Sequence, residues 1–88
     1  MDEYEYKEAV RDALLQKISG LRSTMSESGL IGNTFMETNL ISNIKAHVHH
    51  LARGIVPENN NILFKEVIET LEREKIVVMQ RDDSLLIL

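Results

Sequence analysis

Apolar residues recur every three or four positions along three stretches of the chain, with polar residues between them. This spacing places the apolar side chains on one face of a helix, so it predicts three amphipathic helices. In the first and third stretches, charged residues fall on the opposite face, which is typical of helices that pack on a core from one side. We expect the helices at about residues 5–26, 35–53 and 61–75.

Local signals mark the ends of the second and third helices. Thr34 and Glu37 have the spacing of a capping box, which predicts the start of the second helix. Gly54 follows soon after Leu51, the last residue of the apolar stripe, and we expect it at the C′ position just beyond the helix. Either asparagine at 60–61 offers a side-chain cap for the third helix.

The hydrophobic period changes near the C-terminus. Residues 76–79 and 85–88 are two continuous apolar runs joined by an Asp-rich turn, which predicts a β-hairpin over about residues 76–88. A shorter apolar pair, Leu30 and Ile31, lies in a Gly- and Ser-rich loop, where it either anchors the loop or forms a very short strand. The sequence therefore predicts one helix-rich α+β domain over residues 1–88, with three helices and a C-terminal β-hairpin.

A family resemblance rests on the order of these elements and on three segments. Helix, short apolar island, helix, helix and hairpin is the order of a winged-helix domain. Within that superfamily, the chain is most similar to the C-terminal winged-helix domains of minichromosome-maintenance helicase subunits. The similar segments are the Phe-x-x-Val-x-x-x-Leu helix at 64–71, which leads directly into the hairpin, the closing apolar run 85–88 and the opening segment 6–10. The resemblance implies a recognition role for the third helix, a wing formed by the hairpin, and a setting in DNA replication or another nucleic-acid assembly.

Composition narrows the functional classes. The 88 residues include 14 acidic and 10 basic side chains, for a formal net charge of −4, and no cysteine. The lack of cysteine excludes disulfides, thiolate zinc ligands and a thiol nucleophile. The acidic start differs from a secretory leader, and no apolar run approaches the roughly 18 residues of a membrane span. We therefore expect an intracellular protein, in the cytoplasm or nucleus, with no membrane partner.

Charge also bears on nucleic-acid binding. From Lys65 to Lys75, the third helix has more acidic than basic residues, which disfavours entry of this helix into the major groove. The C-terminal half of the second helix is more basic, although the helix dipole also favours cations there. The candidate nucleic-acid contacts are Lys45, His49 and Arg53 from this helix and Arg81 from the wing.

Catalytic and metal-binding patterns are absent from the sequence. There is no Gly-rich phosphate loop, nucleophile elbow or His-Glu-x-x-His motif. His47 and His50 share a helix face, but a zinc site needs further ligands that nearby residues do not provide. We expect no enzymatic activity, no metal and no cofactor.

The apolar hairpin is the main candidate for partner binding. Its strands are apolar at every position, whereas a small domain covers only one face of a two-stranded sheet, so we expect one set of side chains to remain exposed. The expected function is therefore a non-catalytic module that binds a protein partner or its own copy. The alternatives are a small DNA-binding regulator that uses the second helix, and a viral or plasmid protein that assembles through the hairpin. The candidate partner-binding residues are Val77, Met79, Leu86 and Leu88.

Overall fold

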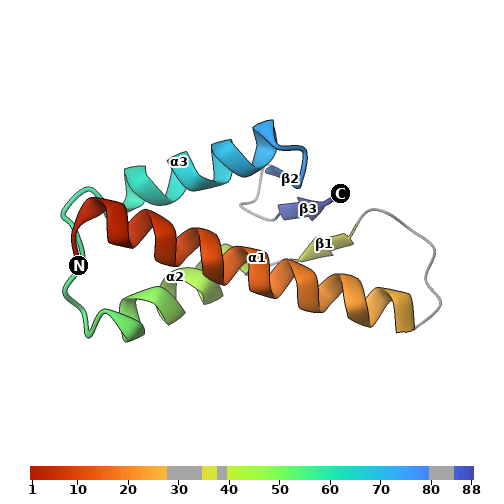
Figure 1. Ribbon diagram of the computed structural model, residues 1–88, viewed down its shortest axis with the longest axis horizontal. Coiled ribbons are helices and arrows are strands. Elements are labelled where there is room, and N and C mark those ends of the chain that lie inside the picture. Colours follow the sequence, from red (N-terminus) through yellow and green to blue (C-terminus); the bar gives the residue numbers. More distant parts are fainter. Residues whose placement is uncertain (28–34, 38–39, 80–84) are drawn as a thin grey trace.

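Three helices pack around one apolar core, and a small antiparallel sheet lies beside them (Figure 1). The computed structural model describes residues 1–27, 35–37, 40–79 and 85–88. The predicted helix-rich α+β class, with three helices and a C-terminal hairpin, is confirmed. In chain order the elements are α1 (Glu3–Glu27), β1 (Phe35–Glu37), α2 (Leu40–Leu51), α3 (Asn60–Arg73), β2 (Val77–Met79) and β3 (Leu85–Ile87).

Helix α1 is the longest element and packs against both other helices. Asp2 caps its start, because the backbone N–H of Glu5 donates a hydrogen bond of 2.8 Å to the Asp2 carboxylate. This bond stabilises the charged form and lowers the pKa of Asp2. Side chains at spacings of four then form a fully buried stripe, as the sequence predicts: Tyr6, Val10, Leu14 and Ile18.

The second helix is shorter than predicted. We expected it over residues 35–53, but Phe35–Glu37 is strand β1 and helix α2 begins at Leu40. The capping-box prediction is therefore wrong: Glu37 lies in a strand, and Thr34 lies outside the described residues. The physical reason is non-local, because β1 pairs with β3 at the far end of the chain and no local signal specifies that pairing. The possible strand at residues 30–31 also lies outside the described residues.

Helices α2 and α3 end in the same hydrogen-bonded motif. After α2, Arg53 N–H donates to the His50 carbonyl and Gly54 N–H to the His49 carbonyl, which is the Schellman pattern. Arg53 therefore occupies the left-handed C′ position, with a φ of 55°, and Gly54 is one residue further along, so the predicted role of Gly54 is corrected. After α3, Lys75 takes the same position with a φ of 62°.

The start of α3 also differs from expectation. The helix begins at Asn60, and the preceding residue, Asn59, makes no side-chain cap. Asn60 instead donates from its side-chain amide to the carbonyl of Pro57 at 2.8 Å, so this asparagine fastens the connection between α2 and α3. The buried face of α3 is as predicted: Leu63, Phe64, Val67, Ile68 and Leu71.

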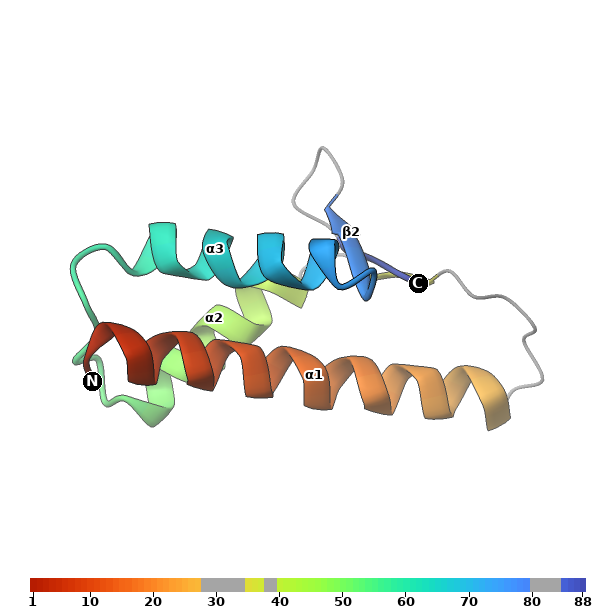
Figure 2. The same cartoon turned by 45° about the horizontal axis from the view of Figure 1, so that its top comes forward.

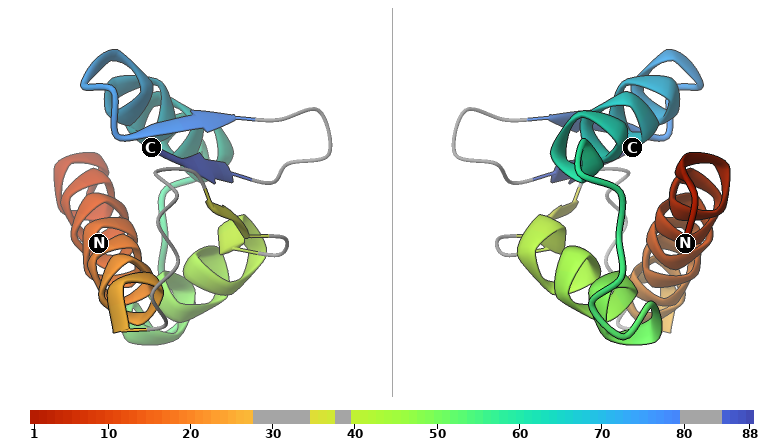
Figure 3. Two further views of the ribbon diagram at one scale, coloured as in Figure 1. Left: turned by 90° about the vertical axis from the view of Figure 1, so that its right-hand side faces the viewer. Right: turned by 90° about the vertical axis from the view of Figure 1, so that its left-hand side faces the viewer.

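The sheet has the strand order β1–β3–β2, and both pairings are antiparallel. Ile87 of β3 lies between Phe35 of β1 and Val77 of β2, which sets the register of all three strands. Seen from the side, α1 extends along the whole molecule and past the sheet (Figure 2). Along the long axis, the three helices occupy three corners and the sheet lies between α2 and α3 (Figure 3).

Candidate interaction surfaces

The register of the hairpin divides its apolar side chains between two faces. Val77 pairs with Ile87, and Val78 pairs with Leu86. Because paired residues point to the same side of a sheet and neighbours alternate, Val77 and Ile87 share one face, and Val78 and Leu86 share the other. The first face is buried in the core, and the second is partly exposed. We call the second face the outer sheet face, formed by Val78, Leu86 and Leu88.

The four predicted partner-binding residues therefore do not form one surface. Val77 is fully buried and Met79 packs against the core, so neither belongs to the outer sheet face. Leu86 is half-buried, and Leu88 is 37% exposed. The sequence analysis placed alternate residues of the first strand, Val77 and Met79, on the same face as Leu86 and Leu88. The register instead pairs Leu86 with Val78, which is 38% exposed.

Among the side chains that the structure describes, the most exposed aliphatic ones lie at the other end of the molecule. Leu51, Ile55 and Ile62 are 60%, 70% and 62% exposed. They come from the end of α2, the loop after it and the first turn of α3, which lie at the same end of the long axis (Figure 3, right). We call these three residues the end surface. In the described part of the chain, the core contains 15 buried apolar residues without them, so these side chains are not needed to complete it.

Sequence reasoning missed this end surface. Leu51 was assigned to the apolar stripe of the second helix, but it lies in the last turn, beyond the part of α2 that is buried at Leu40, Ile44 and Val48. The exposure of Ile62 could have been predicted, because this residue falls outside the three- and four-residue spacing of the apolar stripe of α3. A large aliphatic residue on the polar side of an amphipathic helix is a candidate contact residue.

Charges of both signs flank the end surface. Arg53 and Glu58 are exposed and lie on either side of Ile55 in the chain. Glu58 also lines a shallow groove with Asp2 and Glu3 from the start of α1. Met1 lines the same groove, and its N-terminal ammonium donates a hydrogen bond of 3.3 Å to the carbonyl of Ile55, so charges of both signs meet there. Among the described residues, neither Arg53 nor Glu58 forms an ion pair.

The predicted nucleic-acid contacts have other partners in the fold. Lys45 is half-buried and donates a hydrogen bond to the side chain of Asn61 in α3. His49 is also half-buried, and its Nε2 atom lies 3.1 Å from the hydroxyl of Tyr6, with the two rings edge to face. Unlike Lys45 and His49, Arg53 is exposed. Arg81 lies outside the described residues. These residues therefore do not form one basic surface.

The Tyr6–His49 pair joins α1 to the end of α2. Burial raises the pKa of Tyr6, because the phenolate form loses hydration in the core. The hydrogen bond to His49 satisfies the buried hydroxyl, and no buried side-chain polar atom lacks a partner in the described part of the chain. The link is a structural brace that holds the end of α2 against α1.

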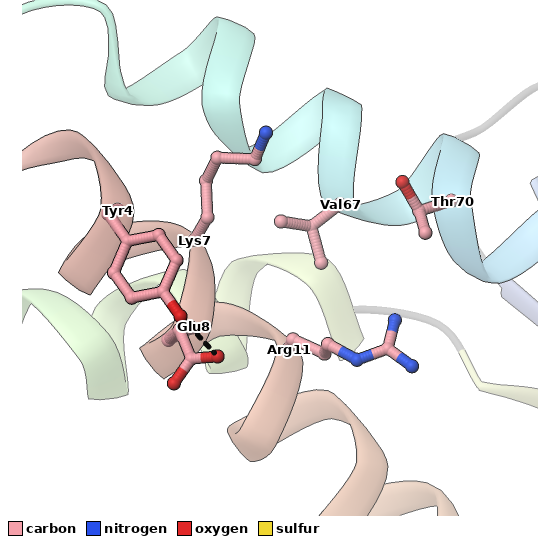
Figure 4. Close-up of a pocket in the computed structure, with 6 residues that line it drawn as sticks. All are labelled: Tyr4, Lys7, Glu8, Arg11, Val67 and Thr70. Atoms are coloured by element: carbon pink, nitrogen blue, oxygen red, sulfur yellow. Dashed lines mark hydrogen bonds between the residues drawn. The ribbon is translucent and has the colours of Figure 1, made fainter.

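A second groove, of about 230 Å³, lies between α1 and α3. Figure 4 shows Lys7 and Arg11 reaching from α1 toward α3, where Val67 and Thr70 line the other side. Tyr4 closes one end, with its hydroxyl at 3.5 Å from a carboxylate oxygen of the neighbouring Glu8.

Ion pairs cross this groove and change the charge of α3. Lys7 lies 3.1 Å from Glu66, and Arg11 forms two hydrogen bonds of 2.7 and 2.9 Å to Glu74. The bidentate bond to Arg11 lowers the pKa of Glu74, and Glu74 raises the pKa of Arg11. Four carboxylates lie between Lys65 and Lys75, and two of them, Glu66 and Glu74, are therefore paired with cations of α1. The sequence could not show these pairs.

Within the described residues, no group of three His, Cys, Asp or Glu side chains is placed to hold a metal ion, and His47 and His50 lie on the exposed side of α2. Of the described helices, none has the length and apolar character needed to cross a membrane. Comparison with known proteins gives no match to any family model, curated protein or solved structure.

Proposed function

We propose that this chain is a non-catalytic interaction module that binds a protein partner, or a second copy of itself, through the end surface. The observation that supports this function is the high exposure of Leu51, Ile55 and Ile62, which the core does not require. Side chains of this kind, when they gather on one part of a small domain, are typical of protein contacts. The same end has both acidic and basic side chains, which can form the polar rim of an interface.

The proposal includes a winged-helix-like arrangement and an intracellular, nucleic-acid-related setting. The supporting observation is the element order α–β–α–α–β–β, with β1 paired to β3 beside the hairpin. This is the order on which the resemblance to minichromosome-maintenance domains rests. The intracellular setting is supported by the lack of cysteine.

A second candidate function is DNA binding by a small regulator. Two observations favour it: α2 contains no acidic residue, and the ion pairs of Glu66 and Glu74 reduce the negative charge that α3 presents. Against it, Lys45 and His49 make intramolecular hydrogen bonds instead of facing solvent together. The third candidate, assembly through the hairpin, would use the outer sheet face, which is less exposed than the end surface.

The test is a set of NMR titrations of the 15N-labelled chain. Extract from the cells that contain its gene is expected to broaden amide signals around Leu51, Ile55 and Ile62 and to leave those of β2 and β3 sharp. Duplex DNA at ~50 mM salt is expected to cause no shifts. The Ile55→Glu variant should abolish the broadening, whereas Val78→Glu, a matched change on the outer sheet face, should retain it.

Two results would contradict the proposal. Shifts along α2 and α3 with DNA that disappear at ~200 mM salt would favour the regulator, because release of counterions makes phosphate contacts salt-dependent. Broadening confined to β2 and β3, and abolished by Val78→Glu, would favour assembly through the hairpin.

A further inference from the structure

A groove between α1 and α2 has a described lining that is basic and apolar and includes no carboxylate. Its volume is about 330 Å³, and the described residues that line it are Ala13, Gln16 and Lys17 of α1 and Ile44 and His47 of α2. Gln16, Lys17 and His47 are exposed, whereas Ala13 is half-buried and Ile44 is 7% exposed. The groove therefore has an apolar floor, with a cation on one wall and an imidazole on the other.

The two grooves beside α1 differ in how their basic side chains are paired. In the groove between α1 and α3, Lys7 and Arg11 both pair with carboxylates of α3. In the groove between α1 and α2, Lys17 and His47 form no hydrogen bond or ion pair with another described residue. The described part of the chain therefore leaves this cation and this imidazole available to an anionic group of another molecule.

Charge is also divided along the chain in a way that favours an acidic ligand at this groove. No acidic residue occurs in 13–26 or 40–57, the segments that supply its two walls, and these segments contain four Lys or Arg residues. By contrast, 12 of the 14 acidic residues lie in 1–12 and 58–88. Exposed charges interact over roughly 10 Å at 0.1 M salt, so the surroundings of the groove attract a ligand that carries carboxylates.

We propose that the groove between α1 and α2 binds an acidic segment of a partner protein. One apolar side chain of that segment fills the floor over Ala13 and Ile44, and neighbouring carboxylates accept hydrogen bonds from Lys17 and His47. The inference goes beyond the proposed function, because none of these residues belongs to the end surface.

The apolar floor favours a protein segment over nucleic acid. Phosphates gain nothing from an apolar floor, whereas a peptide can present an apolar side chain between two carboxylates. The formal net charge of −4 also opposes a long polyanion. A duplex carries one negative charge per about 1.7 Å, so it brings phosphates close to the acidic segments as well as to the groove.

The first test is an NMR titration of the 15N-labelled chain with a library of capped hexapeptides, each with two or three Glu or Asp residues around one Leu, Ile or Phe. We expect saturable shifts of the amides of residues 13–17 and 44–47. The best peptides should have a dissociation constant on the order of 100 μM, because exposed charge pairs contribute little. The same peptides with Gln and Asn in place of the acids should bind at least ~10-fold more weakly.

Charge reversal at a single lysine separates direct contact from the effect of net charge. Lys17→Glu should weaken binding of the acidic peptides by at least ~10-fold, because a carboxylate then faces the carboxylates of the ligand. The matched control, Lys65→Glu, changes the net charge by the same amount at an exposed position of α3. It should change the dissociation constant by less than about twofold, because salt screens distant charges.

A second pair of variants tests the floor without changing any charge. Ala13→Leu places a larger side chain in the groove and should weaken peptide binding by about fivefold or more. Ala46→Leu makes the same change at an exposed position of α2 outside the groove, and should alter binding by less than about twofold. Circular dichroism of each variant checks that the fold is retained.

Several results would overturn the proposal. If no peptide shifts the groove amides at ~2 mM, the groove is not a peptide site. Equal binding of the Gln and Asn peptides, or equal weakening by Lys17→Glu and Lys65→Glu, would exclude the carboxylate contact. Stronger shifts of the same amides with duplex DNA than with any peptide would assign the groove to nucleic acid instead. Ile55→Glu, which alters the end surface, should leave peptide binding unchanged, so the two surfaces are tested independently.

Discussion

The two ends of this molecule present apolar side chains in different ways. At the sheet end, apolar residues are continuous along the sequence, but pairing buries Val77 and Ile87 and leaves their neighbours only partly exposed. At the other end, Leu51 and Ile55 are separated by polar and small residues, yet both are more than half exposed. The number of apolar residues in a segment therefore does not measure the apolar surface that it offers. Register and position beyond the core determine that surface.

The largest effect is expected from aspartate at adjacent positions of β2. Val77→Asp places a carboxylate in the core without a partner, and we expect a loss of about 4 kcal/mol or more in the free energy of unfolding. Val78→Asp adds the same group on the outer sheet face and should cost less than about 1 kcal/mol. Urea denaturation followed by circular dichroism measures both. Equal losses would mean that the two faces of the sheet are not distinguished by burial.

A smaller loss is expected when the brace at the opposite end is removed. His49→Ala leaves the buried hydroxyl of Tyr6 without its partner, which should cost about 2 kcal/mol. His50→Ala is the control, since His50 is exposed and should change stability by less than ~0.5 kcal/mol. Amide hydrogen exchange should then increase around Leu51 more than in β3. A uniform increase would show that the link does not specifically support the end surface.

Substitutions to glycine test the two helix C-termini, at Arg53 after α2 and at Lys75 after α3. Arg53 and Lys75 both have positive φ, a conformation that costs a non-glycine residue roughly 1 kcal/mol. Arg53→Gly and Lys75→Gly should therefore each raise the unfolding free energy by about 1 kcal/mol. Ala46→Gly, inside α2, should lower it by a similar amount, about 1 kcal/mol. Destabilisation by all three variants would show that the left-handed positions are not strained.

The smallest effect concerns the ion pair beside the sheet end. The pKa of Glu74 is lowered by Arg11, so the pair stabilises the fold fully above the ordinary carboxyl pKa of 4.5. This contribution is lost as the pH falls through the pKa that Glu74 has in the folded protein. An NMR titration should give Glu74 a midpoint below the ordinary value, and Arg11→Gln should return it there. Lys7→Gln should leave the midpoint unchanged, because Lys7 pairs with Glu66 instead.

Much of the fold was predictable because helices are specified locally. The spacing of Tyr6 through Ile18 in α1, and of Leu63 through Leu71 in α3, places the buried side chains correctly. Strand β1 was not predictable from its own residues, because Phe35–Glu37 becomes a strand only by pairing with β3, about 50 positions later. Met36 lies four residues before Leu40, so the helical spacing of α2 continues back into the strand. A prediction from local spacing alone therefore extends the helix over β1.

The candidate site was less predictable than the fold. Interaction surfaces depend on which residues remain exposed after packing, and this follows from tertiary contacts. The hairpin was correctly identified, but its inward face could not be chosen without the register that pairs Val78 with Leu86. The acidic character of α3 was also overestimated, because the pairing of Glu66 and Glu74 with α1 is visible only in three dimensions.

The strand order β1–β3–β2 has a consequence for the order of folding. Ile87 pairs with Val77, which is close to it in the sequence, and also with Phe35. The chain segment between Phe35 and Ile87 is roughly five times longer than the segment between Val77 and Ile87. Closing the longer loop costs about 1.4 kcal/mol more in chain entropy, and contacts distant in sequence slow folding. We therefore expect β2 and β3 to pair first and β1 to dock afterwards. Until β1 arrives, β3 has an open edge that a strand of another chain can occupy, so the last step of folding is also the step most sensitive to protein concentration.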